Sequence, residues 1–259
     1  LTGDTYLDEH NLYDFELVST LGLDKDSVDT VKAVDGVKDA EGSWSSDVLF
    51  EEEDSDKGEK VAKLHTVSEK ISTLSLVEGR MPEAADECVV DSLYFTSDDI
   101  GKKIHITDGN DKDTLDMLAE REFTITGLAN SPLYLNFERG STSLGDGKVA
   151  CFIYINPEGW DCDYYTEVYA DLDRSAPIFT DEYDEIADSM EDPLTQALES
   201  CGTARYDDIM DEANEKLSDA EKKLDDAKAD LAEGERKLRQ NEHKLADGQK
   251  EINDNEKKL

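Results

Sequence analysis

An apolar residue occupies every seventh position in the last quarter of the chain. These positions are Met210, Leu217, Leu224, Leu231, Leu238, Leu245, Ile252 and Leu259. The residue three places after each is small or polar, and nearly all others are charged residues, Gln or Ala, which suit an exposed helix. A strict seven-residue repeat of this length predicts that 205–259 form one helix of a left-handed coiled coil, rather than a helix packed on a globular core.

The apolar stripe is narrow, so the predicted helix buries little surface alone and needs a partner helix. Gly234 and Gly248 on the stripe each cost about 1 kcal/mol relative to Ala, which close approach of a partner backbone would offset. We expect either the second helix of a coiled coil in a longer parent protein, or a second copy of this chain in an antiparallel homodimer. The start without Met and the stop at Leu259 favour a piece of a longer protein over a free terminal helix.

The net charge of the chain is −38, and it is unevenly distributed. Residues 205–259 carry 12 basic and 17 acidic side chains, whereas the residues before them carry 15 basic and 48 acidic ones. Such an acidic surface repels nucleic acid and anionic lipid head groups, so we exclude DNA, RNA and membrane surfaces as ligands. No apolar run approaches the roughly 18 residues that would cross a bilayer, and no signal peptide is recognisable.

The sequence carries no motif for catalysis or for binding a metal or cofactor, and we expect none of these functions. The histidines are scattered, at His10, His65, His105 and His243. Acidic turns at 54–56 and 108–113 lack the glycine at the sixth position and the closing glutamate of an EF-hand calcium loop. The cysteines, which are Cys88, Cys151, Cys162 and Cys201, form no C-x-x-C pair. They are either free buried thiols or include a disulfide between Cys151 and Cys162.

The pattern before the repeat predicts an α+β head. Strand, helix, strand and strand are expected at 15–20, 26–34, 40–50 and 61–67, which is half of a ferredoxin-like sandwich. Further strands are expected at 87–90, 104–106, 122–128, 149–155 (central) and 166–172 (edge-like), with a polar loop at 108–116. A helix at 180–201, with Pro193 marking a break or a new first turn, would lead into the repeat. The expected domains are a ferredoxin-like lobe (1–72 with 165–204), a second mixed α/β lobe (73–164) and the heptad helix (205–259).

Four short motifs in the middle of the chain follow one another in a recognisable order. They are V-E-G-R-M-P at 77–82, D-E-C-V-V-D at 86–91, I-G-K-K-I at 100–104 and E-F-T-I-T-G-L at 122–128. This order resembles the extracytoplasmic core domain of MacB/FtsX-type ABC transporter permeases, and the resemblance covers about residues 15–172. The motif residues that carry it are Gly79, Arg80, Pro82, Gly101 and Gly127.

The resemblance implies a role for several of these residues and for the whole chain. Gly79 and Gly127 are expected where the backbone adopts a conformation that other residues resist, and Arg80 is expected to pair with an acidic neighbour. The family function implied is non-catalytic: a domain on the extracytoplasmic side of the bacterial membrane transmits ATP-driven movement of transmembrane helices to a substrate or partner. Its partners would be the rest of the permease and its cytoplasmic ATPase.

An alternative function of a different class also fits the repeat. The chain would then be a secreted or surface-anchored interaction protein, with the coiled coil as a multimerisation stalk and the head as a binding module. The sequence around the chain distinguishes the two hypotheses. A permease requires an apolar span of about 20 residues before the head and a second repeat helix after this one, whereas a stalk protein requires a signal peptide and a surface anchor.

Overall fold

The computed structural model describes residues 3–53 and 58–257 of the chain. The chain divides into two compact units, residues 1–205 and residues 206–259. The first unit, called the head here, contains two β-sheets, several short helices and the first part of α4 (Asp181–Glu256). The second unit is the remainder of that helix. The repeat position Leu259 and the acidic turn at 54–56 lie outside the described residues.

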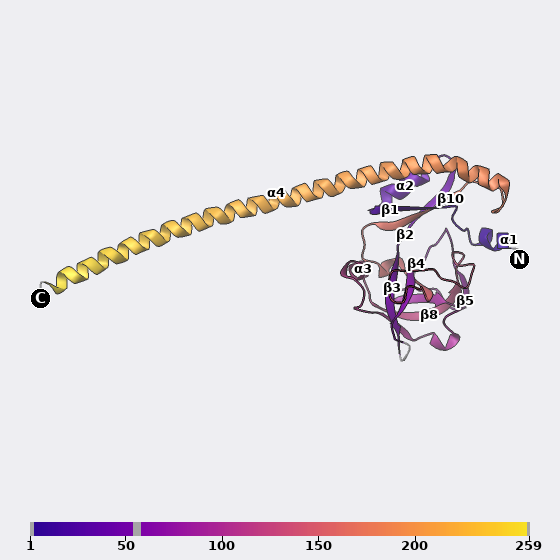
Figure 1. Cartoon of the computed structure of the whole chain (residues 1–259), viewed down its shortest axis with the longest axis horizontal. Helices are drawn as coiled ribbons and strands as arrows, with labels where there is room; N and C mark the ends of the chain where they lie inside the picture. Colours follow the sequence, from indigo (N-terminus) through magenta and orange to yellow (C-terminus); the bar gives the residue numbers. More distant parts are fainter. Residues whose placement is uncertain (1–2, 54–57, 258–259) are drawn as a thin grey trace. The chain divides into compact units, whose positions relative to one another are not determined.

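A three-stranded antiparallel sheet forms one part of the head, in the order β1 (Phe15–Leu23), β10 (Tyr165–Leu172), β2 (Val37–Ser43). Helix α2 (Lys25–Lys32) begins at the N-cap Asp24, whose carboxylate accepts hydrogen bonds from the amide and hydroxyl of Ser27. Figure 1 shows α2 and the first part of α4 along this sheet. Their apolar side chains, among them Val31 and Leu194, pack with Val168 into one core.

A second sheet of seven strands forms the rest of the head. Its order is β5 (Ser75–Gly79), β8 (Glu122–Asn130), β6 (Glu87–Asp91), β9 (Cys151–Ile155), β4 (Lys60–Thr66), β3 (Ser45–Glu52), β7 (Lys103–Ile106). Because β7 also pairs with β8, the six strands other than β5 close into a barrel. The barrel core is fully buried and contains Val48, Phe50, Leu64, Phe123 and Ile153.

Short helices connect these strands. They are α1 (Gly3–Glu9) before β1, α3 (Lys112–Asp116) between β7 and β8, and the 3-10 turns Ser97–Asp99 and Pro157–Gly159. The α+β class and the long C-terminal helix agree with the sequence-based prediction. The polar loop expected at 108–116 is in part the helix α3, because Asp111 caps it by accepting from the amide of Thr114.

The predicted hairpin at 40–50 and 61–67 exists, but it does not extend the sheet that contains β1. β2 ends at Ser43 and β3 begins at Ser45, so the chain passes from one sheet to the other around Trp44. β3 and β4 then pair with each other and with the barrel strands β7 and β9. The second part of the head is therefore a closed barrel, and the observed α+β fold is not specifically the ferredoxin-like lobe expected at 1–72 with 165–204.

Two further expectations are corrected. Strand β10 is the central strand of its sheet and not an edge, because β1 and β2 pair with its two sides. Its polar side chains are paired: Glu167 accepts from Tyr169 Oη at 2.6 Å, and Asp171 binds Lys38 at 2.7 Å. Helix α4 continues through Pro193 without a break. Pro193 and Ser189 are both exposed, so the carbonyl that loses its amide partner to the proline is open to water.

Candidate functional site

The apolar stripe of the repeat is exposed along α4. We call it the seam and define it by the residues predicted to bind a partner helix: Met210, Leu217, Leu224, Leu231, Gly234, Leu238, Leu245, Gly248, Ile252 and Leu259. The exposed fraction of its large described side chains runs from 41% at Met210 to 74% at Leu245. Exposure of this extent leaves the seam without an apolar neighbour within the described part of the chain.

No contact among the described residues explains why the seam has glycine at positions 234 and 248. Outside the adjacent helical backbone, a Cβ atom added at Gly234 or Gly248 would meet no atom of the described residues within 4 Å. Glycine in a helix interior costs about 1 kcal/mol relative to Ala, and here no neighbour in the described chain offsets that cost. Close approach of another backbone at these two positions would do so.

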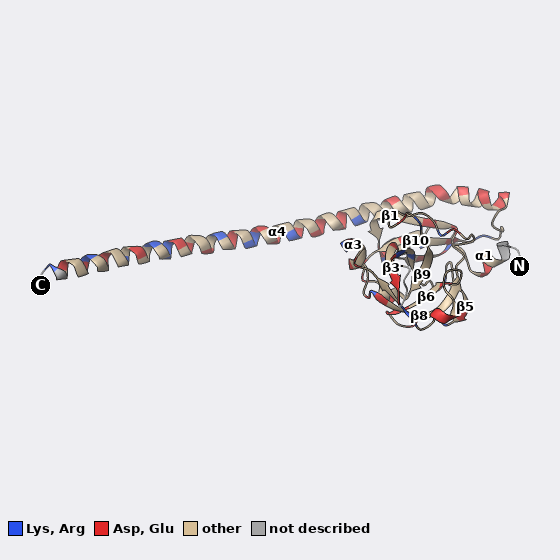
Figure 2. Ribbon diagram, turned by 60° about the horizontal axis from the view of Figure 1, so that its bottom comes forward, with Lys and Arg blue, Asp and Glu red and all other residues tan. Residues whose placement is uncertain are grey.

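The remaining faces of this part of α4 are charged. Figure 2 shows acidic residues on the first turns of the helix and basic and acidic residues interspersed farther along it. Several pairs lie three or four residues apart, such as Lys228–Asp225 at 3.2 Å and Lys237–Glu233 at 2.8 Å. Each such pair stabilises a helix by a few tenths of a kcal/mol, which supports a helix that has no core of its own.

The glycines of the family-like motifs meet across two strands of the head. Gly79 at the end of β5 pairs with Gly127 on β8, and its φ of +81° favours glycine. A Cβ at Gly79 would lie 2.3 Å from the Thr126 carbonyl oxygen, and one at Gly127 would lie 2.6 Å from the Arg80 carbonyl oxygen. Close backbone approach therefore requires glycine at both positions, as the resemblance implied.

Arg80 pairs with an acidic neighbour, as expected, and the neighbour is Glu87 of the next motif. The guanidinium donates to both carboxylate oxygens, at 2.7 Å in the longer contact, and Glu87 also accepts from the Glu83 amide at 2.8 Å. The hydrogen bonds from Arg80, followed by those from the backbone, lower the pKa of Glu87 to about 2. The pair fixes the turn that contains the buried Pro82, which is a structural role.

Gly101 holds the third motif in place. Its φ of +92° lies in the region that favours glycine, and its amide donates to the Ile125 carbonyl at 2.8 Å. The turn before β7 is thereby attached to β8, at the place where the barrel closes.

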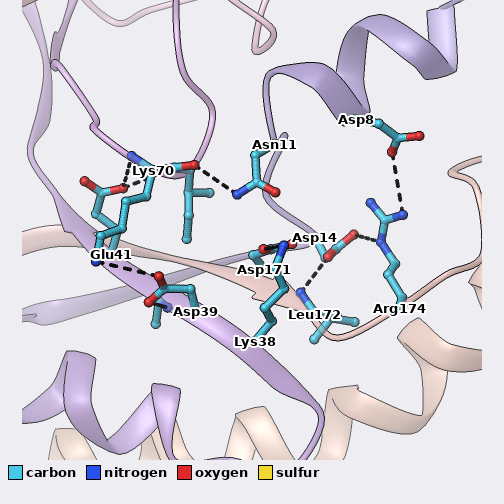
Figure 3. Close-up of polar contacts among 12 residues, drawn as sticks. Asp8, Asn11, Asp14, Lys38, Asp39, Glu41, Lys70, Asp171, Leu172 and Arg174 are labelled. Atoms are coloured by element: carbon cyan, nitrogen blue, oxygen red, sulfur yellow. Dashed lines mark hydrogen bonds and ion pairs between the residues drawn. The ribbon is translucent and has the colours of Figure 1, made fainter.

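Sequence reasoning missed a polar contact between the start of the chain and the approach to α4. Asp14, whose side chain is 0% exposed, accepts from Arg174 Nε at 2.6 Å and from the Leu172 amide at 2.7 Å (Figure 3). Arg174 also lies 3.8 Å from Asp8 at the end of α1. We call Asp8, Asp14, Leu172 and Arg174 the clamp. Asp14 and Arg174 are 160 residues apart in the sequence, so no local pattern indicates the clamp.

A second missed feature is a buried polar layer on the outer face of the barrel. Arg139 donates to both oxygens of Asp91, at 2.6 and 3.0 Å, and its guanidinium lies 5.3 Å from the ring centre of Phe152. His65 contacts Tyr134 Oη at 2.7 Å and stacks on Tyr154. Burial lowers the pKa of His65 to about 3, so its imidazole is neutral, and its Nδ1 has no hydrogen-bond partner among the residues that the structure describes.

The other chemistry-bearing residues do not assemble into a site. Across 3–53 and 58–257, no three His, Cys, Asp or Glu side chains are placed to hold a metal ion. All four cysteines are free, and Cys88, Cys151 and Cys201 are buried, which corresponds to the free-thiol alternative at those three positions. Within the same residues, no helix is long and apolar enough to span a membrane.

No protein-family model matches the sequence, and no curated protein matches it. Solved structures do resemble the fold. One is the extracellular domain of the ABC-type transporter YknZ from Gram-positive bacteria, at 12% identity and a TM-score of 0.38, covering 65% of this chain and 80% of that one. Another is the periplasmic region of MacB from Actinobacillus actinomycetemcomitans, at 13% identity and a TM-score of 0.41, covering 72% and 76%.

Proposed function

We propose that this chain is a non-catalytic extracytoplasmic domain of an ABC transporter permease. In this role the head and α4 transmit movement, driven by ATP hydrolysis in a cytoplasmic ATPase, from flanking transmembrane helices to a substrate or partner outside the cytoplasm. The proposal places the chain on the outer side of a bacterial cell membrane, in an integral membrane protein whose spans lie elsewhere in the parent sequence. Within it, the three-stranded sheet with α2 and the start of α4 corresponds to the family's ferredoxin-like lobe.

The observation that carries this proposal is the way the ordered motifs fit together. Gly79 and Gly127, which lie in different motifs, meet at a contact that only glycine fits, and Arg80 binds Glu87 of the motif between them. Residues from motifs that are separate in the sequence therefore contact one another and hold the turn after β5 in place. This supports reading the motifs as one inherited unit rather than as chance matches.

The seam supports the mechanical part of the proposal. Residues 210–252 rise by about 1.5 Å each, so the described seam is roughly 60 Å long. An unpartnered helix of that length bends, whereas a pair of packed helices resists bending. We infer that the seam binds a second helix, either from the same parent protein or from a second copy, and that the resulting rod carries displacement from the head.

The gene product that contains this chain provides the test. A tagged form should fractionate as an integral membrane protein, should copurify with an ATP-hydrolysing subunit, and should expose the head to protease added outside the cell. Reading the encoding gene should reveal apolar spans of about 20 residues on its flanks. A product that is released from membranes without detergent overturns the permease proposal and favours the secreted interaction protein.

The seam is tested in the same intact protein by Leu231→Glu together with Leu238→Glu. Negative charges on the seam should prevent the second helix from binding. ATP hydrolysis should then persist, whereas transport or activation of the partner should fall. The matched control is Ala229→Glu with His243→Glu, which adds the same charge on the face opposite the seam, where both residues are exposed. Equal effects of the two variants would argue against a helix-binding role for the seam.

A further inference from the structure

Between residues 216 and 244, the residues on either side of the seam carry a regular charge pattern that is reversed in one heptad. One flank consists of the residues four places after each large seam residue, and it is acidic at Glu221, Glu235 and Glu242. The other flank consists of the residues just before each large seam residue; it is basic at Lys216, Lys223, Lys237 and Lys244 and acidic at Glu251. The heptad between 224 and 231 reverses both signs, with Lys228 on the acidic flank and Asp230 on the basic flank. We call these two residues the inverted pair.

The direction of a partner copy decides which flanks meet. In a parallel pair of helices, each flank faces the opposite flank of the other copy; in an antiparallel pair, each flank faces its own counterpart. A parallel pair in register would place Lys228 against Lys223 of the second copy, and Asp230 against Glu235 of the second copy. Both contacts repel, and they offset the two flank contacts that attract, which are Lys216 with Glu221 and Lys237 with Glu242.

An antiparallel pair turns the inverted pair into the source of attraction. When Leu231 lies against Gly234 of the second copy, Lys228 faces the second copy's Glu235 and Asp230 faces the second copy's Lys237. The two-fold axis repeats both contacts. If one helix is shifted by one heptad in one direction, Lys228 and Asp230 each face the same residue of the second copy, so like charges meet. A shift in the other direction does the same for Glu235 and Lys237.

The same register fits the sizes of the seam residues. Reversing one helix places each large residue against the small or polar position of the other copy: Leu231 meets Gly234, Leu217 meets Gly248, and Leu238 meets Ala227. A parallel pair would instead alternate layers of two leucines with layers of two small residues or two asparagines. The antiparallel arrangement keeps the spacing even and brings backbones together at the glycines, where an added Cβ has free space in the single chain.

We propose that the seam of this chain binds a second copy of itself in the antiparallel direction, with Leu231 against Gly234 of the second copy. This rests on the proposed role of the seam in binding a helix, and it names the occupant, the direction and the register. Two like-charged contacts remain in this register, Glu221 with the second copy's Glu242 and Lys223 with the second copy's Lys244. Attraction outweighs them, because the two contacts of the inverted pair are joined by a third, between Lys216 and the second copy's Glu251.

Reversing the inverted pair tests the direction of binding. The variant Lys228→Glu/Asp230→Lys keeps the net charge and turns four attractive contacts into repulsive ones, so sedimentation equilibrium of the full chain at low salt should give a dimer about tenfold weaker or more. A parallel dimer would become tighter in the same variant, which would overturn the proposal. Adding Glu235→Lys/Lys237→Glu should restore the affinity, because the contacts regain opposite signs.

The matched control for this variant is Glu215→Lys/Lys222→Glu on the face opposite the seam. Lys222 pairs with Asp219 at 3.6 Å, three residues before it, just as Lys228 pairs with Asp225 at 3.2 Å. Both variants therefore disturb one ion pair within the helix. Only the change beside the seam should alter dimerisation.

Spin-label distances test the register in a Cys162→Ser background, since the other three cysteines are buried. A label at Glu215→Cys should lie about 50 Å along the axis from its counterpart, and a label at Arg236→Cys only about 10 Å along it. A parallel pair gives equal short distances at both sites, and a one-heptad slide changes each axial distance by about 10 Å. Equal distances overturn the proposal. A chain that stays monomeric overturns it too, while membrane fractionation and ATPase coupling still judge the permease role separately.

Discussion

The barrel and the seam use the same kinds of side chain in opposite surroundings. Phe123 and Ile153 in the barrel are 0% exposed, whereas Leu231 and Leu245 on the seam are 66% and 74% exposed. The barrel therefore gains its stability within the chain, where burial of each large apolar side chain contributes about 1.5–3 kcal/mol. The helix beyond residue 205 depends instead on local ion pairs and on whatever covers the seam. One chain thus contains a self-sufficient unit and a unit whose stability depends on a partner.

Truncating one side chain in each unit should give the largest contrast. Phe123→Ala leaves a cavity in a closed core and should lower the free energy of unfolding of the head by about 3–5 kcal/mol. Leu231→Ala removes a side chain that has no apolar neighbour in the described part of the single chain and should leave the head within about 0.5 kcal/mol of wild type. Chemical denaturation followed by Trp44 and Trp160 fluorescence measures both. Similar losses in the two variants would break the contrast between a core and a seam.

A similar contrast separates buried from exposed ion pairs. Arg139→Met leaves Asp91 buried without its cation and should cost about 3–5 kcal/mol, since both side chains are at most 5% exposed. Lys228→Met removes the cation of an exposed pair on α4 and should cost under about 0.5 kcal/mol in a dilute, monomeric sample. The comparison is made by urea denaturation. A small loss in Arg139→Met would mean that water reaches Asp91.

Glycine to alanine changes should have opposite signs in the two units. Gly127→Ala inserts a Cβ 2.6 Å from a backbone oxygen and should destabilise the head by about 1–3 kcal/mol. Gly234→Ala meets free space and should stabilise the monomeric helix by about 1 kcal/mol, visible as a higher helix melting temperature in circular dichroism. If Gly234→Ala also weakens dimerisation, close approach of a second backbone explains the glycine. If it strengthens dimerisation, that explanation is wrong.

The Arg80–Glu87 pair should give the smallest effect, and one that depends on pH. Because the pKa of Glu87 is lowered to about 2, the pair stabilises the head fully above the ordinary carboxylate pKa of about 4.3. That stabilisation is lost as the pH falls through 2. The difference in unfolding free energy between wild type and Arg80→Gln should therefore shrink steadily between pH 5 and pH 2. A constant difference would mean that Arg80 acts through packing and not through the carboxylate of Glu87.

Local signals predicted the parts of the head that depend on neighbours in sequence. The pattern in 40–50 and 61–67 indicated a hairpin and the pattern in 26–34 indicated a helix, because strand pairing across a turn and helix capping are short-range effects. The order of the motifs also led to the Arg80 pair and to the need for glycine at Gly79. In each case the residues that interact lie within a few positions, or within motifs that were already grouped.

Contacts between distant segments account for what the sequence did not reveal. The central position of β10 depends on its pairing with both β1 and β2, and its Asp171 binds Lys38, 133 residues away. Closure of the barrel depends on β7 meeting β8, and Arg139 finds Asp91 across 48 residues. No contact within the described residues identifies the partner of the seam, and only the flank charges and the sizes of the seam residues restrict it.

The clamp has a mechanical consequence for the head. The Asp14 carboxylate joins the segment before β1 to the segment between β10 and α4, because it accepts from both the Leu172 amide and Arg174. In the role proposed for this chain, a force on the segment before β1 would pass through Asp14 and Arg174 to the residues before α4, without passing through the barrel. Such a force would reach α4 while the hydrophobic core of the barrel keeps its shape.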